Sequence, residues 1–167
     1  MLTANVHELD LRDVGSPVDP TFALRVTFPI TVAQGSQDSA IVYFELEPGK
    51  RLGRHTDSEE EILYIVAGEG EAEVAGERAS VVAGSLAVVP ALAPHQIRNT
   101  GTTTLKVVGF FAGSSVLSLF EESLIPGADQ VLFVTGPNGQ EIFSASPLLP
   151  GGPPQEVETT GQLAGVA

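Results

Sequence analysis

Apolar residues along the chain fall into short runs that are rich in β-branched and aromatic side chains. Each run is bounded by Gly, Pro, Asn or Asp, the residues that commonly separate strands. This pattern predicts strands over Ala23–Phe28, Ala40–Leu46, Ile62–Val66, Ala72–Val74, Val81–Val89, Leu105–Phe111 and Val131–Val134.

Helical periodicity is nearly absent. No window keeps apolar residues at positions i, i+3, i+4 and i+7 for three turns, so an amphipathic helix is not supported. The only helix-like stretch is Ser114–Leu124, and it is short. The 18 Gly and 12 Pro residues also favour turns over long helices. The sequence therefore predicts an all-β fold of the sandwich, jelly-roll or barrel type.

Two turns can be placed from local sequence. Ala67–Gly70 separates an apolar strand from the alternating segment Glu71–Val74, and Asn138-Gly139 between two strand-like runs predicts a hairpin. From Pro147 onward the chain is rich in Pro, Gly and Thr, which is typical of an irregular arm or tail.

Composition narrows the class of protein. The 167 residues fit a single domain with one sizeable core. A net charge of −13 argues against nucleic-acid and anionic-membrane partners, because both are bound mainly by Lys and Arg. The chain has no Cys, and no apolar stretch reaches the length of a membrane span. Its acidic N-terminus lacks the apolar core of a secretory signal, so we expect a cytoplasmic protein.

Candidate chemistry is concentrated in the segment Gly49–Gly68. His55 and Asp57 are two residues apart, so on an extended strand their side chains point to the same face. If the chain reverses at residues 58–60, Glu61 returns beside them. Three groups able to bind a metal would then converge from one hairpin.

A second segment, Gly84–Asn99, carries His95 after an apolar run interrupted by Pro, at the expected start of a further strand. Imidazole and carboxylate groups together suit a divalent ion such as Mn, Fe or Zn. The chain has one other histidine, His7, which lies in the acidic N-terminal arm and is interpreted as a surface residue.

These two segments resemble the two motifs of the cupin family. The first motif, G-x(5)-H-x-H-x(3,4)-E-x(6)-G, is matched by Gly49, His55, Glu61 and Gly68, with Asp57 in place of the second His. The second motif, G-x(5)-P-x-G-x(2)-H-x(3)-N, is matched by Gly84, Pro90, His95 and Asn99, with Leu92 in place of the middle Gly. The resemblance covers about residues 35–112.

The resemblance implies a small jelly-roll barrel, a double-stranded β-helix, that holds one divalent ion and commonly forms a homodimer. The family's ligands carry over as His55, Glu61 and His95. Asp57 either joins them as a fourth ligand or turns aside and leaves two histidines and one carboxylate, a set that suits Fe(II) and O₂ chemistry. We expect an N-terminal arm with strands over residues 1–34, the barrel over 35–118 and a C-terminal extension over 119–167.

Residues around the motifs have simpler interpretations. Glu59 and Glu60 are expected in the turn, and Asn99 is expected to bond the backbone before Gly101. Arg54 and Arg98 lie at odd spacing from the histidines, so they are expected to face away from the site. Leu63 and Ile97 lie at even spacing from Glu61 and His95, so they are expected to point inward as apolar pocket lining. Tyr43 could supply a hydroxyl to the pocket or pack in the core. Which face Phe110 and Phe111 point to stays open.

Three functions from different classes follow. The first is a metal-dependent enzyme that acts on a small organic molecule, by dioxygenase, isomerase or cyclase chemistry, with Glu61 as a ligand or as a base. The alternative is a non-catalytic module that binds or senses a small molecule, suggested by the two motif departures at Asp57 and Leu92 and by the lack of an obvious general acid. A structural or storage role is the third.

Overall fold

The structure is a computed structural model that describes residues 1, 3–128 and 130–145. The predicted tail from Pro147 lies outside these residues. The strands are β1 (Arg12–Gly15), β2 (Ala23–Ile30), β3 (Ala40–Leu46), β4 (Arg51–Asp57), β5 (Glu61–Ala67), β6 (Glu69–Val74), β7 (Glu77–Val82), β8 (Leu86–Val89), β9 (His95–Asn99), β10 (Leu105–Phe111), β11 (Leu117–Phe120), β12 (Val131–Gly136) and β13 (Gly139–Ser144), with one 3₁₀ turn, η1 (Val32–Gln34).

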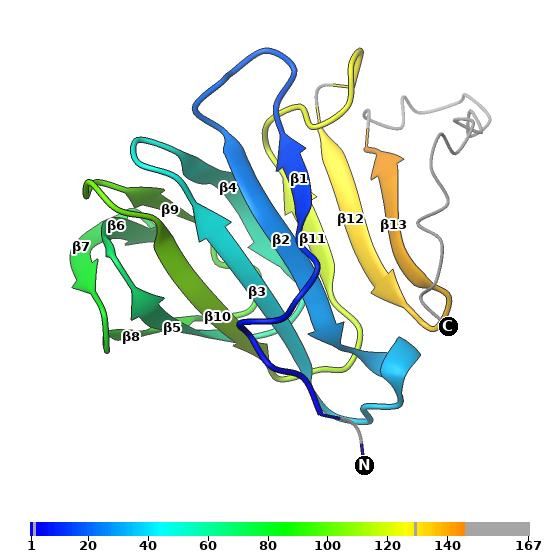
Figure 1. Cartoon of the computed structure of the whole chain (residues 1–167). Helices are drawn as coiled ribbons and strands as arrows, with labels where there is room; N and C mark the ends of the chain where they lie inside the picture. Colours follow the sequence, from blue (N-terminus) through cyan, green and yellow to red (C-terminus); the bar gives the residue numbers. More distant parts are fainter. Residues whose placement is uncertain (2, 129, 146–167) are drawn as a thin grey trace.

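The strands form two antiparallel sheets that face each other (Figure 1). One sheet has the order β1-β2-β3-β10-β5-β8, and the other has the order β13-β12-β11-β4-β9-β6-β7. The all-β prediction is confirmed, and the arrangement is a sandwich of the barrel type. Among the described residues, no helix is long and apolar enough to cross a membrane.

One continuous core fills the space between the sheets. Alternation along β3 sends Val42, Phe44 and Leu46 inward, as the period of two requires. From the opposite sheet, Ile97 joins this core. Each large apolar side chain buried in this way stabilises the folded state by about 1.5–3 kcal/mol. The alternating pattern is therefore enough to fix which face of each strand points inward.

The local predictions need three corrections. Ser114–Leu124 is not helical, because its central part is strand β11. The predicted strand Val81–Val89 is two strands, β7 and β8, separated by a turn in which Gly84 has φ of +91°. The hairpin at the C-terminal end forms as expected, but its two turn residues are 137 and 138, since Gly136 pairs with Gly139.

Strands outside the two motif segments belong to the same two sheets. β1 and β2 extend the first sheet beyond β3, while β11, β12 and β13 extend the second beyond β4. The division of the chain at residues 34/35 and 118/119 stays a prediction.

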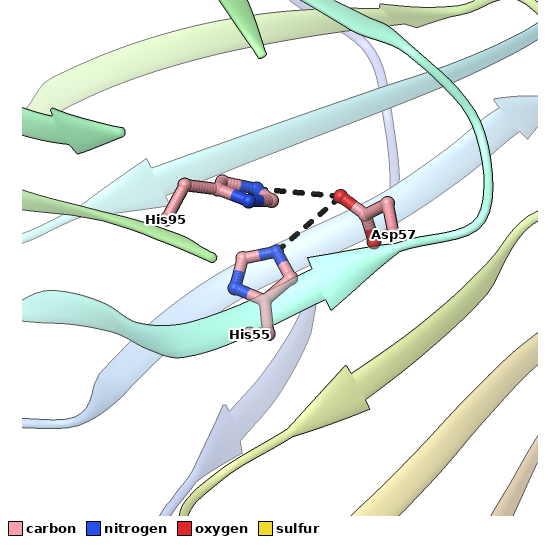
Figure 2. Close-up of side chains that lie close together, drawn as sticks. All are labelled: His55, Asp57 and His95. Atoms are coloured by element: carbon pink, nitrogen blue, oxygen red, sulfur yellow. Dashed lines mark ion pairs between the residues drawn. The ribbon is translucent and has the colours of Figure 1, made fainter. Parts of the chain in front are cut away.

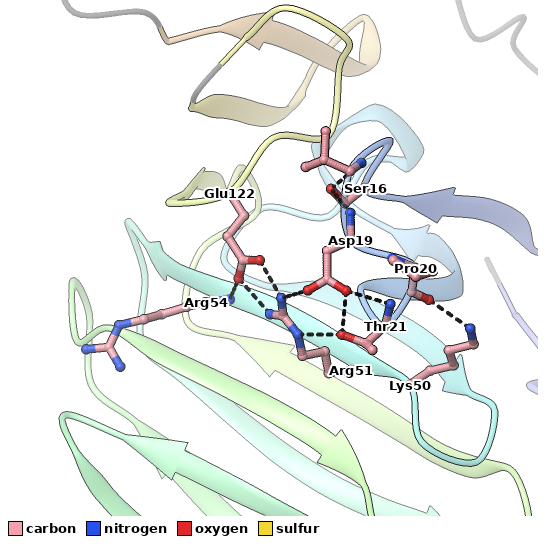
Figure 3. A network of polar contacts seen from close by, with 9 residues as sticks. Ser16, Asp19, Pro20, Thr21, Lys50, Arg51, Arg54 and Glu122 are labelled. Atoms are coloured by element: carbon pink, nitrogen blue, oxygen red, sulfur yellow. Dashed lines mark hydrogen bonds and ion pairs between the residues drawn. The ribbon is translucent and has the colours of Figure 1, made fainter.

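An arginine ties these outer segments to the centre (Figure 3). At the start of β4, Arg51 donates to both carboxylate oxygens of Glu122, in the loop after β11, and to Asp19, in the loop before β2. Its Nε also donates to the hydroxyl of Thr21. Paired, planar contacts of this kind hold two loops in fixed positions against β4.

Candidate metal centre

The centre is built by two neighbouring strands. His55 and Asp57 lie two residues apart on β4, and both side chains are buried between the sheets. His95 opens β9, where it is the direct cross-strand partner of His55. The two imidazole rings are therefore adjacent, with centroids 4.1 Å apart.

Three potential ligand atoms converge (Figure 2). The Oδ2 atom of Asp57 lies 3.3 Å from Nε2 of His95 and 3.6 Å from Nε2 of His55. Asp57 Oδ2 and His95 Nε2 are buried, and neither has a hydrogen-bond partner among the described residues. An unpartnered buried polar atom costs about 1–3 kcal/mol, so such atoms in a native protein indicate something that satisfies them. A cation bound by all three atoms would do so.

The second atom of each side chain is already held. Nδ1 of His55 donates to the carbonyl of Gly53 at 2.8 Å, and Nδ1 of His95 donates to that of Ala93 at 2.9 Å. These bonds place the proton on Nδ1 and leave the lone pair of each Nε2 facing the cluster. Ser118 on β11 donates to the other carboxylate oxygen of Asp57. In proteins, hydrogen bonds of this kind to the second atom of a side chain orient the ligands of a metal ion.

The charges of the centre also suit a cation. Burial lowers the pKa of His55 to about 4, so its imidazole is neutral at neutral pH. Burial would raise the pKa of Asp57, but its neighbours His55 and His95 and the bond from Ser118 lower it, so this carboxyl is ionised. Neutral imidazole and ionised carboxylate are the forms that bind metals.

Glu61 borders the cluster from the opposite sheet. The turn at residues 58–60 brings it to the start of β5, where its carboxyl is buried with Oε2 3.8 Å from Nε2 of His95. Burial raises the pKa of Glu61 well above the usual range, and the charge of Asp57 raises it further. The structure thus brings three predicted ligands together and places the fourth at their edge.

A mainly apolar cleft of about 620 Å³, which includes space open to solvent, leads away from the centre. His55, Asp57, Glu61 and Ser118 stand along it, and the remaining lining is apolar. Six of the eight phenylalanines of the chain contribute: Phe22, Phe28, Phe44, Phe111, Phe120 and Phe133.

The residues proposed as pocket lining lie elsewhere. Leu63 and Ile97 are buried in the core, but they do not line this cleft. Tyr43 is buried and donates its hydroxyl to Glu45 at 2.8 Å, outside the core cluster between the sheets. Of the two phenylalanines with open facing, Phe111 lines the cleft and Phe110 is exposed.

Other residues near the motifs have structural contacts. The Asn99 amide donates to the carbonyls of Leu46 and Thr103, and its oxygen accepts from the backbone of Gly101, which is a turn-holding role. Arg54 pairs with Glu73 and Glu121. Exposed residues that face away from the centre include His7, Glu60 and Arg98.

Leu92 differs from the glycine of the family motif in residue type, but its backbone has a conformation typical of glycine. Its φ is +62°, the left-handed region that favours glycine, and its backbone N–H donates to the carbonyl of Asp57 at 2.8 Å. The loop therefore keeps the path that the motif glycine would give it.

A comparison with protein families gives a match over the part of the chain that carries the two motifs. Residues 42–111 match the family model described as the cupin domain. A comparison with curated protein sequences found no match.

Solved structures share the arrangement of the sheets. A proposed sugar phosphate isomerase from Acidithiobacillus ferrooxidans is 18% identical with a TM-score of 0.56, and the match covers 89% of this chain and 94% of that one. A predicted oxalate decarboxylase from Thermotoga maritima is 22% identical with a TM-score of 0.59, covering 67% and 99%. The polyketide cyclase RemF from Streptomyces resistomycificus is 17% identical with a TM-score of 0.57, covering 66% and 78%.

At these identities the likeness shows a common fold, and one fold hosts many chemistries. The two motifs, the paired sheets and the match over residues 42–111 together show that this part of the chain is a cupin domain.

Proposed function

We propose that the protein is a metal-dependent enzyme that acts on a small organic molecule. One observation carries the proposal: two imidazole nitrogens and one carboxylate oxygen converge beside an apolar cleft, and two of these atoms have no hydrogen-bond partner in the described part of the chain. His55, Asp57 and His95 would hold a divalent ion, with Fe, Mn and Zn as the candidates. Such an ion, when bound, would polarise a carbonyl, enol or phenol oxygen of the substrate.

Three protein ligands leave positions for substrate, which separates a catalytic site from a closed structural one. Glu61 is the group available for proton transfer. Its carboxyl is buried beside the cluster and accepts no hydrogen bond from the residues that the structure describes. In its ionised form it is therefore free to bind the ion as a fourth ligand or to take a proton from the substrate.

The structural neighbours support an enzyme without selecting a reaction. Their names include an isomerase, a decarboxylase and a cyclase on the same fold. Isomerase, cyclase and dioxygenase chemistry all remain within the proposal, because an ion held by His55, Asp57 and His95 would supply a Lewis acid beside the carboxyl of Glu61.

A non-catalytic small-molecule module is the second candidate. It is favoured by the scarcity of polar groups in the cleft, where Ser118 is already bonded to Asp57. Among the described residues that line the cleft, Glu61 is the only side chain outside the proposed ligand set that is left for acid–base chemistry.

The two functions are separated by comparing wild-type protein with the Glu61→Gln and His95→Ala variants. Each is reloaded with Fe(II), Mn(II) or Zn(II) and incubated with a set of phenols, enols and hydroxyketones, and consumption is followed by mass spectrometry. An enzyme consumes at least one compound, and both variants lose that turnover. If the metal-loaded wild-type protein binds compounds but consumes none, and Glu61→Gln binds them equally well, the module is the better account.

A further inference from the structure

The lining of the cleft specifies the kind of molecule that enters it. Resting on the proposed function, we propose that the substrate is an uncharged, largely apolar molecule with an aromatic ring, which presents one oxygen to the metal centre. The C-terminal hairpin of β12 and β13 would select it, through Phe133 and Ile142.

The charges along the cleft disfavour an anionic substrate. No Lys or Arg lines the cleft in the described part of the chain, while Asp57 and Glu61 both do. A divalent ion beside Asp57 leaves about one positive charge, and Glu61 as a fourth ligand would balance it. A dianion such as oxalate or a sugar phosphate would then enter without counter-charges. Burying an unpaired charge costs several kcal/mol.

A nearby cation does not change this balance. The guanidinium of Arg51 lies 5.5 Å from the ring centroid of Phe22, which lines the cleft. Its donors, however, are already bonded to Glu122, Asp19 and Thr21. Arg51 therefore fixes the wall and is not free to receive an anionic substrate.

Aromatic side chains form much of the cleft wall. The ring of Phe120 stacks on His55 with centroids 4.6 Å apart, so one aromatic wall begins at a metal ligand. Three more rings of the lining are stacked: Phe28 lies 5.2 Å from Phe133 and 6.4 Å from Phe111, between ring centroids. Faces and edges of aromatic rings favour another flat ring over an aliphatic or strongly polar group.

Part of the cleft wall comes from the C-terminal hairpin. Phe133 on β12 and Ile142 on β13 are direct cross-strand partners, and both line the cleft. They lie outside residues 42–111, the part that matches the family model. The metal ligands are thus supplied by the shared barrel, whereas this wall is particular to the extension, where selectivity between substrates would be set.

The test uses 1-naphthol as the probe, with oxalate and glucose 6-phosphate as charged competitors. Binding to the Mn(II)-loaded full chain is measured by calorimetry, and the metal content of every sample is counted. Phe133→Trp fills the cleft. Phe143→Trp is the matched control, because Phe143 lies on the same hairpin, is 41% exposed and does not line the cleft. Ile142→Phe narrows the same wall and serves if Phe133→Trp does not fold.

We expect 1-naphthol to bind at least about tenfold more tightly than either anion. Phe133→Trp or Ile142→Phe should weaken it about tenfold at unchanged metal content, and Phe143→Trp should change it less than about twofold. Tighter binding of oxalate or glucose 6-phosphate, or equal effects of Phe133→Trp and Phe143→Trp, would overturn the inference while leaving the metal-dependent function in place. Binding of 1-naphthol to a wild-type chain that takes up no ion would instead overturn that function and support the apolar ligand.

Discussion

Gly109 leaves the space that the carboxyl of Glu61 occupies: a Cβ at position 109 would lie 1.9 Å from Oε1 of Glu61. The same Cβ would lie 2.6 Å from a methyl group of Val42, so the space is enclosed on two sides. The glycine at position 109 of β10 therefore leaves the room that the Glu61 carboxyl needs beside the cluster.

The variant Gly109→Ala should force Glu61 out of its place and lower the free energy of unfolding by about 1–3 kcal/mol, the usual cost of overpacking a core. Urea unfolding measures the change. Gly136→Ala is the matched control, because Gly136 is also in a strand and nothing lies within 4 Å of the added Cβ. Equal stability of Gly109→Ala and wild type would contradict the enclosed position of Glu61.

Asp57 is predicted to bind the ion directly, while Ser118 only orients it. Loss of an orienting partner typically lowers metal affinity by about 10–100-fold. We therefore expect Ser118→Ala to fall in that range and Asp57→Asn to lose more than about 100-fold, measured by competition with a chelator. An Asp57→Asn variant with the affinity of wild type would show that the carboxylate turns away from the metal.

The buried histidine makes the metal-free protein sensitive to acid. The pKa of His55 is about 4 in the folded state against 6.5 in the unfolded state, so between these values the unfolded state binds the proton and the folded state does not. The contribution of neutral His55 to the free energy of unfolding is thus fully present above pH 6.5 and is lost as the pH falls toward 4.

The raised pKa of Glu61 acts in the opposite direction, because it stabilises the folded state at low pH and this contribution is lost as pH rises above 4.5. The measurement is therefore made in the Glu61→Gln variant without metal. Its free energy of unfolding should fall by about 2 kcal/mol between pH 6.5 and 4.5. In a Glu61→Gln/His55→Gln double variant this fall should shrink markedly. An equal fall in both proteins would mean that His55 is not buried in its neutral form.

A homodimer stays a prediction. β1 and β13 end their sheets at one side, and unpaired strand edges favour pairing with another chain. Light scattering at tens of micromolar protein should give about twice the 17.4 kDa mass of one chain. A mass of one chain would refute it.

Strands of regular alternation could be predicted from sequence, because a period of two reports burial directly. β11 could not, since Ser118 stands on its buried face, where its hydroxyl bonds Asp57, while Leu117 and Leu119 are exposed. A polar residue inside and apolar residues outside reverse the usual pattern, which explains the helix-like interpretation of Ser114–Leu124.

The candidate metal cluster could be predicted from sequence because its three residues lie in two local segments with fixed spacing. The cleft could not be predicted, because its walls combine strands far apart in the chain. Phe28 meets Phe133 only through the packing of two sheets, and no local spacing records that contact. Parity placed Leu63 and Ile97 on the inward face correctly, but it gives no information on which inward residues border the empty space.

The central claim is that His55, Asp57 and His95 hold a divalent ion. Its most direct test is elemental analysis of chelator-stripped protein after reloading with Fe(II), Mn(II) or Zn(II) and removal of free ion. The account predicts about one ion per wild-type chain and a large loss in His95→Ala, with the fold retained by circular dichroism. Less than about 0.1 ion per wild-type chain with every metal would contradict it.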